Sequence, residues 1–285
     1  MVRHALIVIL ALLASHAVAR GDISIVAAEN VYGDVARQVA GPDAKVSSVL
    51  SNPDQDPHLF EASASVARLL SGAAIVVYNG AGYDPWMTKL LGATLAAGRS
   101  VIVVADLVHW REGGNPHLWY DPPTMPTFAR ALAAELAQRD PEHRGDYATR
   151  LASFLGSLDP LAARIASLRQ RLEGAPVTAT EPVFGLMAAA LGLSIRNERL
   201  QVAVMNNAEP RASDVAAFET DLRSHAVRLL LFNSQATSAA AQRLVRIARQ
   251  SGVPVVGVTE TLPAGQSYQA WMAAELDAVD RALAP

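Results

Sequence analysis

Two histidines of this 285-residue chain share a local sequence that suits metal binding. His58 lies in DPHLF and His117 in NPHLW, so each follows a polar residue and a proline and precedes leucine and an aromatic residue. Because proline fixes its own φ and pushes the preceding residue toward an extended conformation, each imidazole is expected to project from a stiff loop after a strand. Either histidine alone would be interpreted as a packed loop residue. The repeated segment instead indicates a divalent transition-metal site, since neutral imidazole commonly binds such ions.

A third donor is needed to complete such a site. The candidate from the second half of the chain is Glu181, in TATEPVFGLM, at the end of a predicted strand. A carboxylate followed by proline and a helix start is also typical of a helix cap or of a charge that faces the helix dipole. The residue types alone leave both interpretations of Glu181 open.

Other side chains do not form a comparable pattern. His109 is expected to be a polar loop residue, and His143 and His225 lie near helix ends, where surface or capping roles are expected. The glycines of residues 79–84 (NGAGYD) lack the spacing of a phosphate-binding loop, and Ser234 has no Gly-x-Ser-x-Gly context. Nucleotide binding and serine hydrolase chemistry are therefore not indicated.

The composition is that of a globular protein with no overall attraction for polyanions. Hydrophobic residues make up 51% and charged residues 18% of the chain, and the formal net charge is −3, so a nucleic-acid partner is not expected. The chain has no cysteine, which excludes disulfides and thiolate ligands. A metal site must therefore use His, Asp, Glu, amide or backbone donors.

Residues 1–19 have the features of a cleavable export signal. Arg3 and His4 precede the apolar run ALIVILALLA, and an Ala-x-Ala site ends at Ala19. The run is too short to span a bilayer, so we expect cleavage after Ala19 and export to the periplasm. A lipid-anchored protein would carry a cysteine directly after its signal, so no lipid anchor is expected.

Residues 20–145 are predicted to form a first α/β lobe. Short apolar strands alternate there with helical segments, which is typical of a parallel sheet covered on both faces. The strands are expected at residues 22–29, 45–51, 73–80 and 100–106. The helices between them are expected at residues 30–41, 62–72 and 85–98.

Residues 146–173 are predicted to form one long linking helix. Apolar residues from Tyr147 to Leu172 follow steps of three and four, which places them on one stripe. Pro160 lies inside this pattern and removes a hydrogen bond, so a kink or break is expected near residue 156.

Residues 174–285 are predicted to form a second α/β lobe. Its strands are expected at residues 175–182, 227–234 and 253–260, and its helices at 183–191, 212–225, 239–250 and over the final residues to 284. The predicted fold class is therefore α/β, with two small lobes, each a mainly parallel sheet with flanking helices, joined by one long helix. Ligands of open α/β sheets bind beyond the carboxyl ends of the strands, so a ligand cleft is expected where the lobes meet.

The chain resembles the cluster A-I metal-binding receptors of bacterial ABC transporters, which are zinc- and manganese-binding periplasmic proteins. The resemblance rests on the long helix and on the segments AAENVYGDVARQVAG, DPHLFEAS, NGAGYDPWM, NPHLWYDP, TEPVFGLMAAALGL, EPRASDVAAFE and LLLFNS. It implies two α/β lobes bridged by a rigid helix, with the metal held between them.

The resemblance also implies His58, His117 and Glu181 as metal ligands. Zinc-type relatives usually have histidine at the third position, whereas manganese-type relatives have glutamate, as here. A hard oxygen in place of a nitrogen favours Mn²⁺ or Fe²⁺ relative to a His-rich site, although affinity alone still favours Zn²⁺. The expected cargo is one divalent ion, Mn²⁺ or Zn²⁺, with Fe²⁺ as a third option.

The fourth ligand is the point where this chain departs from the family pattern. The family commonly has an aspartate after the strand that corresponds to LLLFNS, and Thr237 occupies that place here. The fourth donor is therefore open among Asn233, Gln235, Thr237, Glu260 and water. Taken by itself, Glu260 is expected to be a solvated surface acid.

The residues that follow His117 are expected to support its ring. Trp119 and Tyr120 would exclude water, and Asp121 or a backbone carbonyl would accept the second imidazole N–H. Core packing and helix capping are the alternatives, and core packing is preferred for Tyr120.

Two functions of different classes follow. The first is a monomeric periplasmic solute-binding protein, not an enzyme, that captures the ion between its lobes and delivers it to an inner-membrane ABC permease. The alternative is an exported metallohydrolase, because two histidines and one glutamate with a vacant position are also the ligands of a catalytic zinc. Asp56 and Glu61, which flank His58, keep that alternative open. A surface adhesin, a role of some relatives, loses support without a lipid-anchoring cysteine.

Overall fold

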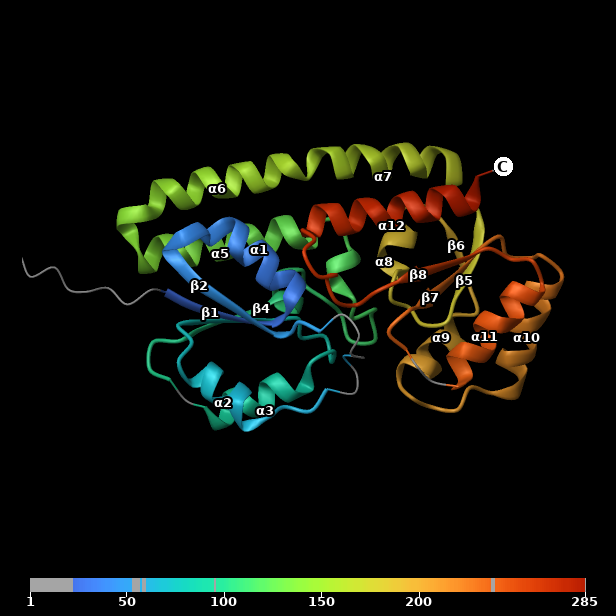
Figure 1. Ribbon diagram of the computed structural model, residues 1–285, viewed down its shortest axis with the longest axis horizontal. Helices are drawn as coiled ribbons and strands as arrows, with labels where there is room; N and C mark the ends of the chain where they lie inside the picture. Colours follow the sequence, from blue (N-terminus) through green and yellow to red (C-terminus); the bar gives the residue numbers. More distant parts are fainter. Residues whose placement is uncertain (1–22, 53–56, 58–59, 95, 237–238, 285) are drawn as a thin grey trace, which may run out of the picture.

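Two α/β lobes lie end to end beneath one long run of helix (Figure 1). The structure is a computed structural model that describes residues 23–52, 57, 60–94, 96–236 and 239–284. The predicted signal segment, residues 1–19, lies outside the described residues. The predicted fold class is confirmed, since each lobe has one sheet of four parallel strands with helices on its faces.

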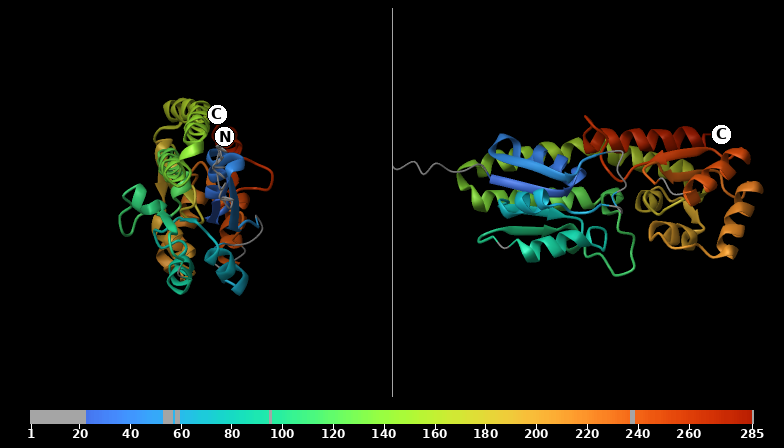
Figure 2. Two further views of the ribbon diagram at one scale, coloured as in Figure 1. Left: turned by 90° about the vertical axis from the view of Figure 1, so that its left-hand side faces the viewer. Right: turned by 60° about the horizontal axis from the view of Figure 1, so that its bottom comes forward.

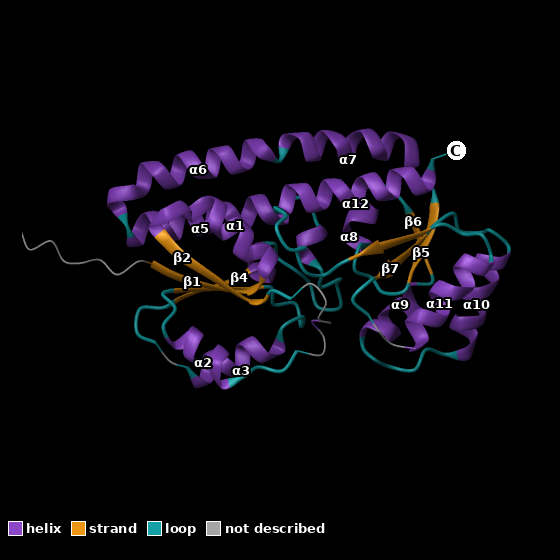
Figure 3. Ribbon diagram, in the orientation of Figure 1, coloured by secondary structure: helices purple, strands orange, loops and turns teal. Residues whose placement is uncertain are grey.

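The first sheet has the strand order β2-β1-β3-β4. Its strands are β1 (Ile23–Glu29), β2 (Ala44–Leu50), β3 (Ile75–Tyr78) and β4 (Ser100–Val103). Successive residues of β1 point to opposite faces, so Ile25 and Ala27 join one hydrophobic cluster while Val26 and Ala28 join another. Helices α1 and α5 cover the first face and α2 and α3 the second (Figure 3), which explains why these strands are apolar throughout.

The helices of this lobe include two α-helices that were not predicted from the sequence. They are α1 (Asn30–Ala40), α2 (Ala64–Ser71), α3 (Pro85–Ala93), α4 (Val104–Leu107) and α5 (Thr124–Arg139), with the 3-10 helices η1 (Gly41–Asp43), η3 (Leu118–Tyr120) and η4 (Pro141–His143). The missed helices are α4, which replaces the second half of the strand predicted at residues 100–106, and α5, where Phe128, Leu132 and Leu136 form a buried stripe at helical spacing.

The linking element consists of two helices in line, α6 (Arg144–Ser157) and α7 (Asp159–Leu172), which together span both lobes (Figure 1). The break falls at Leu158, two residues after the predicted position. Pro160 lies in the first turn of α7, where a missing N–H costs no helical hydrogen bond. The proline therefore starts a second helix and does not kink a single one.

The second sheet has the strand order β6-β5-β7-β8. Its strands are β5 (Pro176–Ala179), β6 (Ser194–Arg196), β7 (Leu230–Asn233) and β8 (Val255–Val258). Its helices are α8 (Gly185–Ala190), α9 (Glu198–Met205), α10 (Ala212–Arg223), α11 (Ala239–Gln250) and α12 (Tyr268–Leu283). The elements β6 and α9 were not predicted, and β6, with three residues, is too short to show a period.

The two lobes share one continuous hydrophobic core. The same cluster of buried residues contains Val35 of α1, Leu231 of β7 and Leu276 of α12. Helix α12 lies along α7 (Figure 2), and at the junction of the lobes the ring of Tyr120 packs edge-on against Phe184 and Trp271. This core joins the lobes beneath α6 and α7. None of the helices in the described part of the chain is both long and apolar enough to cross a membrane.

Gly33 permits the close packing of α1 on β2. A Cβ at this position would overlap the hydroxyl oxygen of Ser48, a side chain on the neighbouring strand. We expect Gly33→Ala to lower the free energy of unfolding by about 1–3 kcal/mol, because the core must shift to relieve the overlap. In Gly33→Ala/Ser48→Ala most of this loss should be recovered, since the remaining Ser48 Cβ would lie 3.4 Å away. Urea unfolding of both variants and of Ser48→Ala checks this, and equal losses in the single and double variants would contradict the stated cause.

Candidate metal site

His117 is fully buried and its ring is fixed by a neighbouring amide. Asn115 Oδ1 lies 2.8 Å from His117 Nδ1 and 3.0 Å from the backbone nitrogen of His117. The side-chain nitrogen of Asn115 donates to the carbonyl of Pro182 in the other lobe at 2.6 Å, which fixes the orientation of the amide. Since an amide oxygen can only accept, Nδ1 carries a hydrogen, and in the neutral ring Nε2 is then the nitrogen with a lone pair. Support for the ring thus comes from Asn115, not from Asp121, which is half-buried and continues the turn after η3.

Three polar side chains of the second lobe meet at the carboxyl edge of its sheet. Glu181 follows β5, Asn233 ends β7 and Glu260 follows β8, and these strands are adjacent in the sheet. All three side chains are buried, with exposed fractions of 5%, 1% and 0%. Because parallel strands end at the same edge, residues distant in the sequence converge there.

Glu260 is not the solvated surface acid expected from the sequence alone, since it is fully buried and two side chains of the first lobe contact it. Its Oε2 lies 3.3 Å from His117 Nε2 and accepts a hydrogen bond of 2.8 Å from the hydroxyl of Tyr83. Its Oε1 accepts a 2.5 Å hydrogen bond from Asn233. The carboxylate therefore faces the lone-pair nitrogen of the histidine across the boundary between the lobes.

Two amides that were candidates for the fourth ligand are engaged in hydrogen bonds. The side-chain nitrogen of Asn233 donates to Glu181 Oε2 at 3.2 Å as well as to Glu260. The side-chain oxygen of Gln235 accepts from the backbone nitrogens of Glu260 and Thr261 at 2.6 and 3.2 Å. Gln235 thus holds the backbone that carries Glu260.

Tyr83 is a site residue that the sequence analysis missed. It belongs to NGAGYD, the segment set aside for lacking phosphate-loop spacing, and its ring meets His117 and Trp119 edge-on with centroids 5.7 and 4.9 Å apart. Asp84 holds the turn by accepting from the backbone nitrogens of Asn79 and Gly80 at 2.8 and 2.9 Å. Burial, followed by the nearby Glu260 charge, raises the pKa of Tyr83, so its hydroxyl remains a donor. The signal available in the sequence was a tyrosine placed after a predicted strand end.

Tyr120 is a core residue, as preferred from the sequence. Its ring is fully buried, and its hydroxyl lies 2.7 Å from both the carbonyl of Thr259 and Glu275 Oε2. Trp119 is also fully buried and stands at 88° to the ring of His117. The aromatic residues therefore exclude water from one side of the imidazole, as expected.

Some predicted residues lie outside this cluster. His58, Asp56 and Thr237 lie outside the described residues. His109 and His225 are exposed, and His143 lies at a helix start, where its ring nitrogen is 2.6 Å from Asp140.

The described residues bring together His117 and Glu260, with Glu181 joined to Glu260 through Asn233. Among these described residues, no group of three or more His, Asp or Glu side chains is arranged to hold a metal ion.

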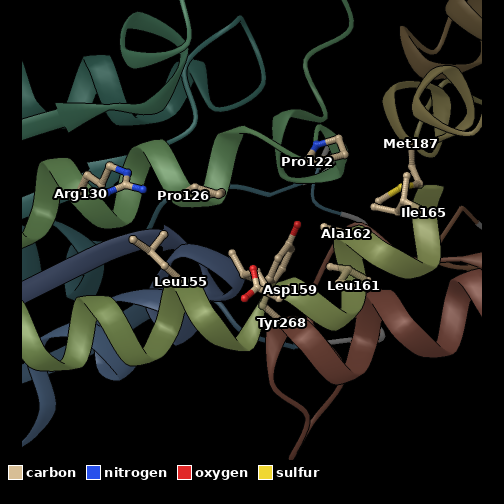
Figure 4. A pocket seen from close by; sticks show the side chains of 11 residues that line it. Pro122, Pro126, Arg130, Leu155, Asp159, Leu161, Ala162, Ile165, Met187 and Tyr268 are labelled. Carbon is tan, nitrogen blue, oxygen red and sulfur yellow. The ribbon is translucent and has the colours of Figure 1, made fainter. Parts of the chain in front are cut away.

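A cleft of about 560 Å³ lies between the lobes and reaches Tyr83. Its walls include Asn115 and Pro116 from the first lobe and Pro182 and Leu186 from the second. A separate cavity of about 280 Å³ lies beneath the break between α6 and α7, lined among others by Pro122, Asp159 and Tyr268 (Figure 4). Only the larger cleft adjoins the His117 and Glu260 cluster.

Comparisons with known proteins agree with a metal-binding role. Residues 25–282 match the profile of a family described as ZnuA, zinc-uptake complex component A, periplasmic. The manganese ABC transporter substrate-binding lipoprotein PsaA of Streptococcus pneumoniae is 28% identical over 152 residues, which are 49% of this chain and 49% of PsaA. The zinc-binding protein AdcA of Streptococcus pyogenes is 23% identical over 289 aligned residues, covering 90% of this chain and 55% of AdcA. The matched parts span about half the length of these two relatives.

The fold is shared with a solved structure. The periplasmic zinc-binding protein TroA from Treponema pallidum superposes with a TM-score of 0.79 at 20% identity, over 93% of this chain and 100% of TroA. At this identity the likeness establishes the fold, and the site must be argued from the residues themselves.

Proposed function

Because the chain belongs to the family of periplasmic zinc-uptake components, whose profile it matches over residues 25–282, we propose that it is a periplasmic metal receptor. It captures one divalent transition-metal ion between its lobes and delivers the ion to an ABC permease of the inner membrane. The observation that carries this proposal is the 3.3 Å approach of His117 Nε2, from the first lobe, to Glu260 Oε2, from the second.

The proposed ligands are His58, His117 and Glu181, with Glu260 as the fourth donor. Glu260 replaces the other candidates because it is buried against His117, whereas the amides of Asn233 and Gln235 are used in hydrogen bonds. Two imidazoles and two carboxylates suit Mn²⁺, Fe²⁺ and Zn²⁺. The relatives named above include one manganese and one zinc protein, which supports both ions as cargo.

Four protein donors make a closed site, which favours a receptor over an enzyme. A catalytic zinc keeps one position for water or substrate, whereas closure by Glu260 fills that position. Release then requires the contacts between the lobes to loosen, and the shared core beneath α6 and α7 favours movement of the loops around the site over a wide separation of the lobes.

We further propose that the mature protein is a monomer, free in the periplasm and without a lipid anchor. The predicted signal supports the periplasmic location, and the absence of cysteine supports the unanchored state, whereas PsaA is named a lipoprotein. The proposed division is a signal peptide at 1–19, lobes at 20–145 and 174–285, and a linking segment at 146–173, which the structure forms as two helices in line.

A metal titration tests the proposed function. Metal-stripped protein should bind one Mn²⁺ or Zn²⁺ per chain, and free ion at a hundred times the dissociation constant should stabilise the fold by about 2.7 kcal/mol. Calorimetric titration gives the stoichiometry, and thermal unfolding with each ion gives the stabilisation, which a chelator should reverse. Absence of stabilisation by Mn²⁺, Zn²⁺ and Fe²⁺ would refute the receptor, and metal-dependent hydrolysis of esters or phosphates would favour the alternative enzyme.

A further inference from the structure

We propose that Asn233 is a positioning residue that holds the two carboxylates of the metal site, Glu181 and Glu260, at the spacing that receives the ion. The proposal rests on the metal-receptor function above and removes Asn233 from the set of candidate ligands. It assigns the residue a role that depends on hydrogen bonds to the ligands and not on a bond to the metal.

The position of Asn233 in the sheet lets it reach both acids. It is the last residue of β7, which lies between β5 and β8, and Glu181 and Glu260 follow those two flanking strands. The side-chain nitrogen of Asn233 donates to Glu181 Oε2 at 3.2 Å and to Glu260 Oε1 at 2.5 Å. One amide group therefore bridges the two carboxylates.

The orientation of the amide is determined by its other contact. The oxygen of the Asn233 side chain accepts from the backbone nitrogen of Gln235 at 3.0 Å. Turning the amide over would place its oxygen against two carboxylates and its NH₂ group against a backbone N–H. The observed orientation uses both amide hydrogens on the acids and directs the oxygen away from them.

Two buried carboxylates on one edge repel each other and need hydrogen-bond donors. A lysine or arginine between them would supply donors but would also neutralise charge that a dication needs. Asn233 supplies two donors without adding charge, so the two negative charges remain available to the ion. A neutral amide at this position therefore fits a receptor for a doubly charged cation.

The test compares Asn233→Asp with Asn233→Ser. Asp has the shape of Asn but no amide hydrogens, and it adds a third carboxylate, so we expect Zn²⁺ and Mn²⁺ affinity to fall by about 10- to 100-fold, as for other residues that orient metal ligands. Ser keeps one hydroxyl donor, so its loss should be smaller than that of Asp. The affinities are measured by competition with a chelator of known strength, on protein shown to be folded by circular dichroism.

The opposite order would overturn the proposal. If Asn233 were itself a ligand, Asp would be a better oxygen donor, and Asn233→Asp would bind at least as tightly as the wild type while Asn233→Ser would be the weakest. The visible absorption of bound Co²⁺ gives a second readout. The band intensities, which report the coordination number, should be unchanged in Asn233→Ser if Asn233 does not touch the ion, and a change in coordination number would count against the proposal.

A matched control variant and the wild type distinguish a failure of the receptor function from a failure of the role proposed for Asn233. Gln170→Glu makes the same change of an amide to a carboxylate at an exposed position on α7, away from the cleft, and should leave the affinity unchanged. If the wild type fails to bind any of the ions, the receptor function itself is wrong. If the wild type binds and Asn233→Asp binds equally well, only the role of Asn233 is wrong.

Discussion

Replacing Glu260 with glutamine is expected to weaken Zn²⁺ and Mn²⁺ binding by more than about 100-fold, a larger loss than for a residue that only orients ligands. The change removes one of two carboxylates and replaces an anionic donor next to His117 Nε2 by a neutral amide. The shape is retained, and the new amide can still accept from Asn233 and donate to the hydroxyl of Tyr83. Metal-free stability should therefore change little, so the effect is confined to binding.

Isothermal titration with each ion measures the loss, and Glu209→Gln is the matched control. Glu209 is an exposed acid between α9 and α10, so its variant removes the same charge away from the site. Binding by Glu260→Gln at wild-type strength, together with a normal Glu209→Gln, would show that Glu260 does not touch the ion. The fourth donor would then have to be water or Thr237.

Replacing Glu275 with glutamine is expected to make the metal-free protein more stable at high pH. Glu275 lies on α12, and its Oε1 accepts from Trp271 Nε1 and from the backbone nitrogen of Thr259. Its Oε2 lies 2.7 Å from the hydroxyl of Tyr120, which is also 2.7 Å from the carbonyl of Thr259. A single hydroxyl hydrogen does not serve both oxygens well, so the network is complete only in the protonated form of Glu275, whereas in the ionised form Tyr120 donates to the carboxylate.

The raised pKa of Glu275 agrees with a protonated carboxyl group in this network. Burial raises its pKa to about 8, although hydrogen bonds from Tyr120 and Thr259 act in the opposite direction. An acid with a raised pKa in the folded state binds more protons folded than unfolded, so its contribution to stability falls as pH rises. The free energy of unfolding begins to fall near pH 4.5, the ordinary pKa of a glutamate, and levels off above about pH 8. The total loss is at most about 5 kcal/mol.

Glutamine at position 275 resembles the protonated acid and cannot ionise. The stability of Glu275→Gln minus that of the wild type should therefore be near zero at pH 5 and rise by a few kcal/mol toward pH 9. Taking this difference cancels the contributions of Glu29 and Asp84, whose pKa values burial also raises.

Urea unfolding of metal-free protein at pH 5, 7 and 9 measures the difference. Glu135→Gln is the control, because burial raises the pKa of Glu135 but hydrogen bonds from Ser100 and Arg139 outweigh it and lower that pKa below 4.5, so the difference in stability between Glu135→Gln and the wild type should stay constant from pH 5 to pH 9. A constant difference between Glu275→Gln and the wild type across this range would mean that Glu275 is ionised in the folded protein.

The alternation of elements was predictable because it depends on local periodicity. Strands β1, β2 and β7 and helices α1 and α11 lie within a few residues of their predicted positions. Among the segments that were missed, α4, β6 and α9 are short, and α5 was given no assignment although its buried residues follow helical spacing. The order of strands and helices, and with it the division into two lobes and a linking segment, follows from hydrophobic patterns that extend over about ten residues each.

The sequence by itself also determined which residue types had to provide the site. The absence of cysteine restricted the donors to nitrogen and oxygen, and the repeated Pro-His segment indicated His117 as one of them. The structure then placed this ring in a buried position with its Nδ1 bound by Asn115, two residues away in the chain. Such a contact depends on a short loop, and proline limits the conformations of that loop.

Only the tertiary structure decided that Glu260 belongs with His117 and Tyr83. The hydroxyl of Tyr83 and the carboxylate of Glu260 are separated by 177 positions in the chain, and no local pattern reports a contact across that distance. His117 and Tyr83 of the first lobe contact the Glu260 carboxylate at the edge of the second sheet. The carboxylate is buried where the first lobe docks over that edge, and the docking depends on a core shared by both lobes.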